Sequence, residues 1–196
     1  MANKITKDSV LYVTKICAIL LVITMCVAFL LSFVNAITKD TIAANEAAQV
    51  SEALSKLFSG ASNPTSNPIG GSFDSTVNGF YEVKDGETLV GYYADVSPVG
   101  FKGAVNMMVA LDTEGKVMGV QILTHSETIG IGTKIEEPEF LSGFVGKSGS
   151  LEYKKGAGAN ENGVIDGISG ATYSSKAVIN GVNQALKAYA TVKGGA

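Results

Sequence analysis

The longest uninterrupted hydrophobic stretch of the chain lies near its N-terminus. Residues 16–36 read ICAILLVITMCVAFLLSFVNA and contain no charged side chain. At about 1.5 Å of rise per residue, a helix of this length crosses the hydrocarbon core of a lipid bilayer, which is about 30 Å thick. The pattern therefore predicts a single transmembrane helix over residues 16–37.

Lysines flank this stretch unevenly, which predicts an orientation. Lys4, Lys7 and Lys15 precede it, whereas a single lysine follows closely. The positive-inside rule then keeps residues 1–15 in the cytoplasm and exports the remaining chain. A cleaved signal peptide is the alternative, because Val34–Ala36 has the small residues of a cleavage site. Signal sequences have hydrophobic regions of only about 7 to 15 residues, however, so an uncleaved anchor in the cytoplasmic membrane (the inner membrane, where there are two) is expected.

The segment after the anchor divides into two parts by composition. Residues 38–58 are rich in Ala, Glu, Lys and Gln and contain neither Gly nor Pro. Their apolar residues follow roughly helical spacing, which predicts a helix leading out of the membrane. Residues 59–76 concentrate Ser, Asn, Pro and Gly, which is typical of a connector. Together they form a predicted membrane-proximal helix and linker over residues 38–76.

Two hairpin patterns follow the linker. Asp85-Gly86 separates two β-rich runs between Tyr81 and Val96, and a second turn at Thr113–Gly115 separates another pair of runs. Such turns predict antiparallel hairpins and a sheet of about four strands. The glycine-rich crossover Ser97–Gly103 joins the hairpins, and it is either a plain turn or a place where backbone approaches a ligand.

Helical patterns accompany these strands. Residues 137–144 have a proline suited to a first helical turn, and apolar residues recur with helical spacing from Val178 to Tyr189. Residues 77–196 thus read as one small domain, and the fold class is α+β: a transmembrane helix, then an antiparallel sheet with packed helices.

The charge and the cysteine content of the chain limit the classes of function that it can have. The net charge of -3 gives no reason to expect nucleic-acid binding, because proteins that bind nucleic acids carry a basic patch. All 15 cationic residues are lysines, so no guanidinium is available to clamp a phosphate. Any phosphate must then be held by backbone N–H groups, lysine, hydroxyls or a covalent bond. Cys17 and Cys26 lie inside the hydrophobic stretch and form neither a disulfide framework nor a zinc-binding spacing.

The segment with the most chemical content is Asp166–Ser175, DGISGATYSS. It lies where the C-terminal helix is expected to begin, and helix N-termini present unpaired N–H groups that accommodate anions. Gly170 permits close approach of backbone, and hydroxyls surround the spot at Ser169, Thr172, Ser174 and Ser175. By these features alone, an ordinary helix cap is the stronger alternative.

The same segment resembles the flavinylation signature of FMN-binding domains, in which an Asp precedes Ser/Thr-Gly-Ala-Thr and a further Ser. The resemblance implies that the Thr172 hydroxyl carries FMN covalently, in phosphoester linkage. A separate magnesium-dependent flavin transferase would donate the FMN phosphate from FAD and recognise Asp166. The cofactor-binding residues implied around Thr172 are Ser169, Gly170, Ala171, Ser174 and Ser175.

A second stretch, Leu123–Lys134, resembles the family pattern His-x-Glu-Thr-Pro-Gly-Leu-Gly. It departs from the pattern at Ile129, where the family usually has Pro, and at Ile131. The resemblance implies that five further residues lie near the flavin: His125, Glu127, Thr128, Gly130 and Gly132. From the residues alone, a single histidine after a strand is more often a structural hydrogen-bonding group than a proton donor, and Glu127 could equally be solvated.

The whole chain resembles the RnfG family, the G subunits of the Rnf complex, which is an ion-translocating ferredoxin:NAD+ oxidoreductase. The resemblance implies a covalent-FMN electron-transfer subunit that relays electrons between ferredoxin and NAD+, coupled to Na+ or H+ translocation, and is not catalytic alone. The other Rnf subunits would be its partners, with the flavin transferase acting during maturation. The alternatives are the C subunit of a sodium-pumping NADH:quinone reductase, a non-redox membrane-anchored interaction domain, and the flavin module of a soluble reductase.

Overall fold

The computed structural model describes residues 7–156 and 163–194. The chain divides into two compact units, residues 1–48 and 49–196. In its described part, the first unit is the greater part of helix α1 (Lys7–Leu57), and the large apolar side chains between Val10 and Ile42 are exposed. Its most apolar 18-residue window has a mean hydropathy of 2.9 and is not buried at all, so α1 is long and apolar enough to cross a membrane. This agrees with the predicted transmembrane helix.

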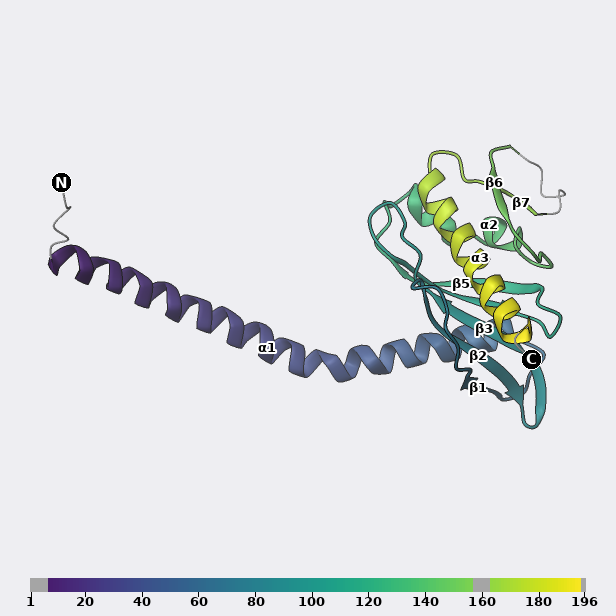
Figure 1. Cartoon of the computed structure of the whole chain (residues 1–196), viewed down its shortest axis with the longest axis horizontal. Coiled ribbons are helices and arrows are strands. Elements are labelled where there is room, and N and C mark those ends of the chain that lie inside the picture. The colour runs from purple at the N-terminus through teal and green to yellow at the C-terminus, as the bar shows by residue number, and fades with distance from the viewer. Residues whose placement is uncertain (1–6, 157–162, 195–196) are drawn as a thin grey trace. The chain divides into compact units, whose positions relative to one another are not determined.

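The second unit is built on an antiparallel sheet with the strand order β1-β2-β3-β4-β5 (Figure 1). The strands are β1 (Pro64–Pro68), β2 (Val77–Asp85), β3 (Thr88–Val96), β4 (Val105–Leu111) and β5 (Val117–His125). β2 with β3 and β4 with β5 form the two predicted hairpins. Gly86 and Gly115 lie in the turns with φ of 63° and 83°, a conformation that only glycine adopts without strain.

The expected connector at residues 59–76 is partly wrong, because it contains strand β1. β1 pairs with β2 from Pro64 opposite Asp85 to Pro68 opposite Tyr81, so the sheet has five strands rather than about four. An edge strand tolerates proline, since the missing N–H leaves no gap in a ladder. The Asp85 carboxylate accepts the N–H groups of Ser62 (2.9 Å) and Asn63 (3.1 Å), which fixes the start of the strand.

The remaining elements follow β5. They are η1 (Gly132–Glu136), α2 (Pro138–Ser142), β6 (Glu152–Lys154), β7 (Val164–Asp166) and α3 (Thr172–Gly194). α2 and α3 confirm the predicted short helix and the predicted C-terminal helix. The short parallel pair of β6 and β7 has no counterpart in the sequence patterns, because three-residue strands are too short to show alternation.

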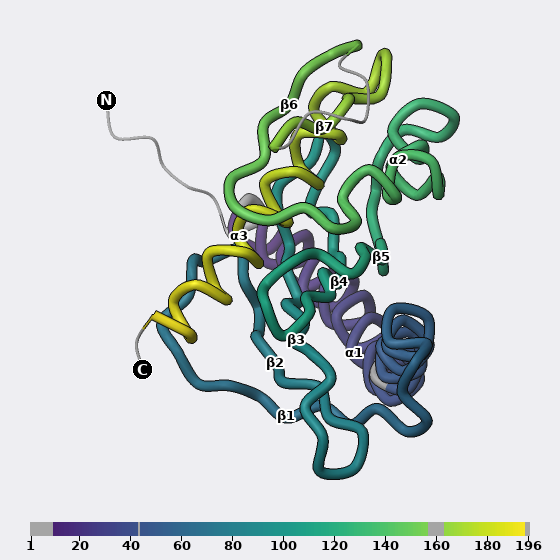
Figure 2. Tube along the Cα trace, turned by 90° about the vertical axis from the view of Figure 1, so that its right-hand side faces the viewer, coloured from purple at the N-terminus to yellow at the C-terminus, as the bar shows by residue number. Residues whose placement is uncertain are grey.

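The sheet buries both of its faces. Alternate residues of β4 point to opposite sides, so Met107 and Val109 pack against α3 while Met108 and Ala110 pack against the end of α1. α3 and residues 49–57 of α1 accordingly lie on opposite sides of the sheet (Figure 2). The larger of the two hydrophobic cores lies between the sheet and α3. This core therefore supports the N-terminal part of α3.

We expect the smaller core to depend on Phe58, which is 1% exposed just after the end of α1. Phe58→Ala should lower the free energy of unfolding by about 3–5 kcal/mol, because it leaves a cavity between the helix and the sheet. Urea denaturation of the full chain in detergent micelles, followed by tyrosine fluorescence, measures this. Lys56→Ala, at an exposed position, is the control and should cost about 0.5 kcal/mol or less. Equal midpoints for the two variants would contradict the assignment.

Candidate functional site

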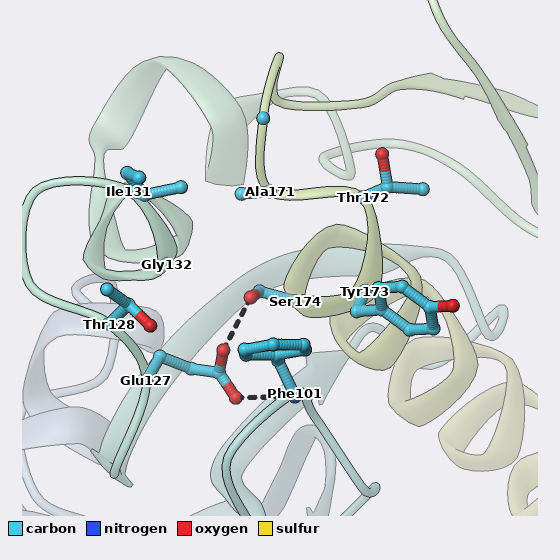
Figure 3. Close-up of a pocket in the computed structure, with 10 residues that line it drawn as sticks. Phe101, Glu127, Thr128, Ile131, Gly132, Ala171, Thr172, Tyr173 and Ser174 are labelled. Atoms are coloured by element: carbon cyan, nitrogen blue, oxygen red, sulfur yellow. Dashed lines mark hydrogen bonds between the residues drawn. The ribbon is translucent and has the colours of Figure 1, made fainter.

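A cleft of about 320 Å³ opens where three segments of the chain meet (Figure 3). These segments are the crossover after β3, the loop after β5 and the N-terminus of α3. The residues that line the cleft are Phe101, Glu127, Thr128, Ile131, Gly132, Gly170, Ala171, Thr172, Tyr173 and Ser174. The fold thus brings together the two stretches of sequence that were singled out, and it adds the crossover to them.

The carboxylate of Glu127 joins the three segments. Its Oε1 accepts the N–H groups of Phe101 (2.8 Å) and Lys102 (3.2 Å) in the crossover. Its Oε2 accepts the hydroxyl of Ser174 in the first turn of α3, at 2.6 Å (Figure 3). Glu127 is 6% exposed, so these bonds form away from bulk water. The alternative of a solvated Glu127 side chain is therefore wrong.

Two glycines make this buried position possible. A Cβ at Gly132 would lie 2.7 Å from the Cβ of Glu127 and 3.0 Å from its Oε2. A Cβ at Gly100 would overlap Oε1 of the same carboxylate. Any other residue at either position would displace Glu127. The role of these glycines in the cleft is thus to let backbone approach a buried charge.

Glu127 remains ionised despite its burial. Burial alone would raise the pKa of Glu127, since a low-dielectric environment disfavours the charged form. The hydrogen bonds from Ser174, Lys102 and Phe101 act in the opposite direction and outweigh burial, so the pKa lies below the usual value for glutamate. The wall of the cleft therefore contains a fixed negative charge at neutral pH.

His125 supports this arrangement from outside the cleft lining. Its Nδ1 accepts the N–H of Glu127 at 3.1 Å, and its Nε2 lies 2.9 Å from Oε1 of Glu136. With Nδ1 as an acceptor, the proton of a neutral ring resides on Nε2 and points at Glu136. Gly130, also outside the lining, donates its N–H to Thr133 Oγ1 at 3.0 Å. The geometry of His125 is that of a structural hydrogen-bonding residue.

The first turn of α3 places Thr172 at the edge of the cleft. The first helical hydrogen bond runs from the Ser175 N–H to the Ala171 carbonyl at 2.9 Å. The N–H groups of residues 172–174 precede it and have no partner within the helix, so they form an anion-binding end. Gly170, with a φ of 85°, turns the chain into the helix.

The hydroxyls around Thr172 have different surroundings. Ser175 is fully buried; its Oγ donates to the Ala171 carbonyl (2.9 Å) and accepts the Ile168 N–H (3.0 Å). Ser174 is held by Glu127, and Ser169 is exposed but does not line the cleft. Among the serines and threonine of this segment, Thr172 and Ser174 are the two residues that line the cleft. The Ser174 hydroxyl is bound to Glu127 and so holds the helix in place, whereas the Thr172 hydroxyl has no such role.

Asp166 is the last residue of β7 and does not line the cleft. Its Oδ1 accepts the Gly156 N–H at 2.7 Å, and its side chain is exposed. The Asp166 side chain thus lies on the surface of the domain. This exposed position is compatible with recognition by another protein.

Sequence patterns did not identify the aromatic part of the site. Phe101 and Tyr173 are 63% and 70% exposed, and their ring centroids lie 5.9 Å apart at the mouth of the cleft. Tyr153 in β6 approaches Thr172, with 3.3 Å between the two side-chain oxygens. The glycines around Phe101 indicated a close approach of backbone, whereas nothing local distinguished Tyr153. Apolar walls beside an anion-binding helix end fit a ligand with a flat aromatic part and a phosphate.

Comparison with known protein families agrees with this chemistry. Residues 100–187 match the model of the FMN-binding domain, and residues 13–57 match that of the RnfG N-terminal region. Together the two matched segments cover more than half of the chain. The chain thus combines an RnfG N-terminal region with an FMN-binding domain. The segment that matches the FMN-binding domain contains every residue that lines the cleft.

Relatives of this chain come from bacteria and archaea. The G subunit of the ion-translocating oxidoreductase complex of Methanosarcina acetivorans is 28% identical, over 89% of this chain and 93% of the relative. The protein of the same name from Vibrio vulnificus is 26% identical, over 81% and 80%. The G subunit of the proton-translocating ferredoxin:NAD(+) oxidoreductase complex of Clostridium ljungdahlii is 32% identical, over 61% and 65%.

A solved structure also resembles this chain. The C subunit of the Na(+)-translocating NADH-quinone reductase from Parabacteroides distasonis superimposes with a TM-score of 0.49 and 24% identity. The superposition covers 58% of this chain and 61% of that one.

We expect the Glu127 carboxylate to stabilise the domain in a pH-dependent way. Because its folded pKa is depressed, its contribution is complete above the unfolded pKa of about 4.3 and is lost as the pH falls through the folded pKa. Glu127→Gln should therefore be less stable than wild type by about 1–2 kcal/mol at pH 7. The difference should shrink below about pH 4. Urea denaturation of the full chain in micelles between pH 7 and pH 3 measures both effects.

The matched control is Glu87→Gln, at an exposed turn position. It should follow wild type at every pH, because exchanging an exposed carboxylate for an amide at a turn removes no buried hydrogen bond. A pH-independent difference between wild type and Glu127→Gln would show that the Glu127 charge does not contribute.

Proposed function

We propose that this chain is the FMN-carrying electron-transfer subunit of a membrane-bound Rnf complex, with FMN joined through its phosphate to the Thr172 hydroxyl. The observation that carries the proposal is the position of Thr172, at the N-terminus of α3 and on the cleft of an FMN-binding domain. The surrounding segment Asp166–Ser175 resembles the flavinylation signature.

The residues of the cleft fit this cofactor. The unpaired N–H groups at the start of α3 favour a phosphodiester charge, and the covalent bond replaces the arginine clamp that the chain lacks. Phe101, Ile131 and Tyr173 provide apolar surface for the ring system. When bound, FMN supplies the transfer of single electrons. The chain's own contribution is to fix the walls through Glu127 and to exclude water from one side of the ring.

The assembly is inferred from the relatives. Several are subunits of complexes named for ion translocation, and the Clostridium ljungdahlii relative belongs to one named for ferredoxin, NAD(+) and proton translocation. We infer the same relay of electrons here, coupled to Na+ or H+ movement. The sequence contains neither an iron–sulfur cysteine set nor a dinucleotide-binding GxGxxG after a strand. Other Rnf subunits would therefore bind ferredoxin and NAD+, and this protein is an electron carrier that is not catalytic alone.

The cell compartment follows from the lysine asymmetry around the anchor. Residues 1–15 would lie in the cytoplasm, and the FMN-binding domain would lie on the outer side of the membrane. A covalent link suits that location, since a cofactor lost there is not recovered. A flavin transferase would load the domain during maturation, with Asp166 as part of its recognition surface.

Loss of the Thr172 hydroxyl is expected to abolish covalent flavin. Wild type co-expressed with a flavin transferase should keep flavin fluorescence on a denaturing gel and gain the mass of FMN minus water. Thr172→Ala should show neither, whereas Thr172→Ser tests whether any hydroxyl at this position suffices. Thr191→Ala, at an exposed position in the last turns of α3, is the control and should be labelled like wild type.

The outcome also separates the alternatives. Retention of flavin mass by Thr172→Ala would rule out the proposed linkage. Absence of flavin mass from wild type, with an active transferase present, would favour a non-redox anchored domain.

The orientation is tested by cysteine labelling in intact cells. In a variant with Cys17 and Cys26 replaced by serine, Ser148→Cys places one thiol at an exposed position of the FMN-binding domain. A membrane-impermeant maleimide should label this thiol without lysis. Asn3→Cys, in the segment expected to be cytoplasmic, should be labelled only after lysis. The reverse pattern would overturn the orientation.

A further inference from the structure

The hydroxyl of Thr172 has one hydrogen-bonding partner among the described residues. It is the phenol of Tyr153, with 3.3 Å between the oxygen atoms, and either group can donate. Tyr153 lies in β6, opposite Ile165 of β7 in the parallel pair. The short β6–β7 pair therefore brings this tyrosine to the acceptor threonine from a distant part of the sequence.

The backbone around Tyr153 is shaped to admit its ring. A Cβ at Gly167 would lie 2.7 Å from Cδ2 of Tyr153 and would overlap the ring edge. Gly167 is the second residue of the Asp166–Ser175 signature, so the glycine at this position has a steric function. The Lys176 ammonium lies 5.3 Å from the centroid of the Tyr153 ring, within the range of a cation–π contact.

We propose that Tyr153 is a positioning residue for covalent attachment of FMN: its hydroxyl orients the Thr172 hydroxyl as the phosphoryl acceptor. This inference rests on the proposed function. In the transfer, the Thr172 Oγ–phosphorus bond forms and the phosphoanhydride bond of FAD breaks. AMP leaves, and the proton of Thr172 passes to a base of the flavin transferase. No electron transfer is involved.

A phenol suits both stages of this reaction because it can donate and accept. Before transfer, Tyr153 accepts the Thr172 O–H and thereby limits the rotation of the side chain. After transfer, Thr172 has no proton, and Tyr153 donates to an oxygen of the phosphodiester. Lys176 lies four residues after Thr172, on the same side of α3, and adds positive potential to that of the helix end.

The test is the rate at which the full chain is flavinylated. Apo-protein from cells without a flavin transferase is incubated in micelles with purified transferase, FAD and Mg2+, and the intact mass is followed over time. Tyr153→Phe removes one oxygen atom and should lower the turnover rate at saturating acceptor by about three- to ten-fold, the worth of one neutral hydrogen bond. The final extent of labelling should reach that of wild type.

Tyr81→Phe is the matched control, because it removes a phenol oxygen from the opposite face of the sheet. It should react at the wild-type rate. A second measurement concerns the product: the phosphorus NMR resonance of the attached phosphodiester should shift in Tyr153→Phe and stay unchanged in Tyr81→Phe. This shift is independent of the transferase, and a merely structural tyrosine would not produce it in a folded domain.

The outcomes separate the two proposals. Wild-type rate and wild-type phosphorus resonance in Tyr153→Phe would overturn the role of Tyr153 and leave Thr172 as the acceptor. Labelling of Thr172→Ala would instead overturn the proposed function, and with it this inference.

Discussion

The cleft depends on the ionised carboxylate of Glu127, which accepts three hydrogen bonds from two other segments of the chain. A buried negative charge is tolerated only when such donors replace its hydration. Two glycines are needed for the donors to come close enough. The bond to Ser174 fixes the first turn of α3 relative to the crossover that carries Phe101. The position of Thr172, two residues before Ser174, follows from that bond.

The sheet provides the rigid base for this arrangement. Its two faces are both covered, by α3 on one side and by residues 49–57 of α1 on the other, so each strand is held from both directions. The crossover and the loop after β5 leave the same end of the sheet, and α3 begins beside them. Functional residues therefore sit on loops and on a helix end whose supports are packed, which is how a precise site is built from irregular segments.

Most of the fold was accessible to sequence reasoning. The turn at Asp85-Gly86 and the helical spacing from Val178 onwards are local signals, and the corresponding elements are present. Strand β1 was not predicted, because its Ser, Asn and Pro residues have low strand propensity and only pairing with β2 orders them. The pair β6–β7 was missed for a similar reason: each strand has three residues, and the pairing between them lies outside any local window.

Patterns of neighbouring residues were enough to locate the hydrophobic anchor, the start of α3 at Thr172 and the family signature around it. The roles of the side chains, in contrast, came from tertiary packing. Glu127 and Ser174 are 47 positions apart, and Tyr153 and Thr172 are 19 apart. Contacts over such separations depend on how strands and helices pack, which no local periodicity encodes. Packing thus made Glu127 a buried anchor rather than a solvated carboxylate, and it brought a tyrosine to the threonine.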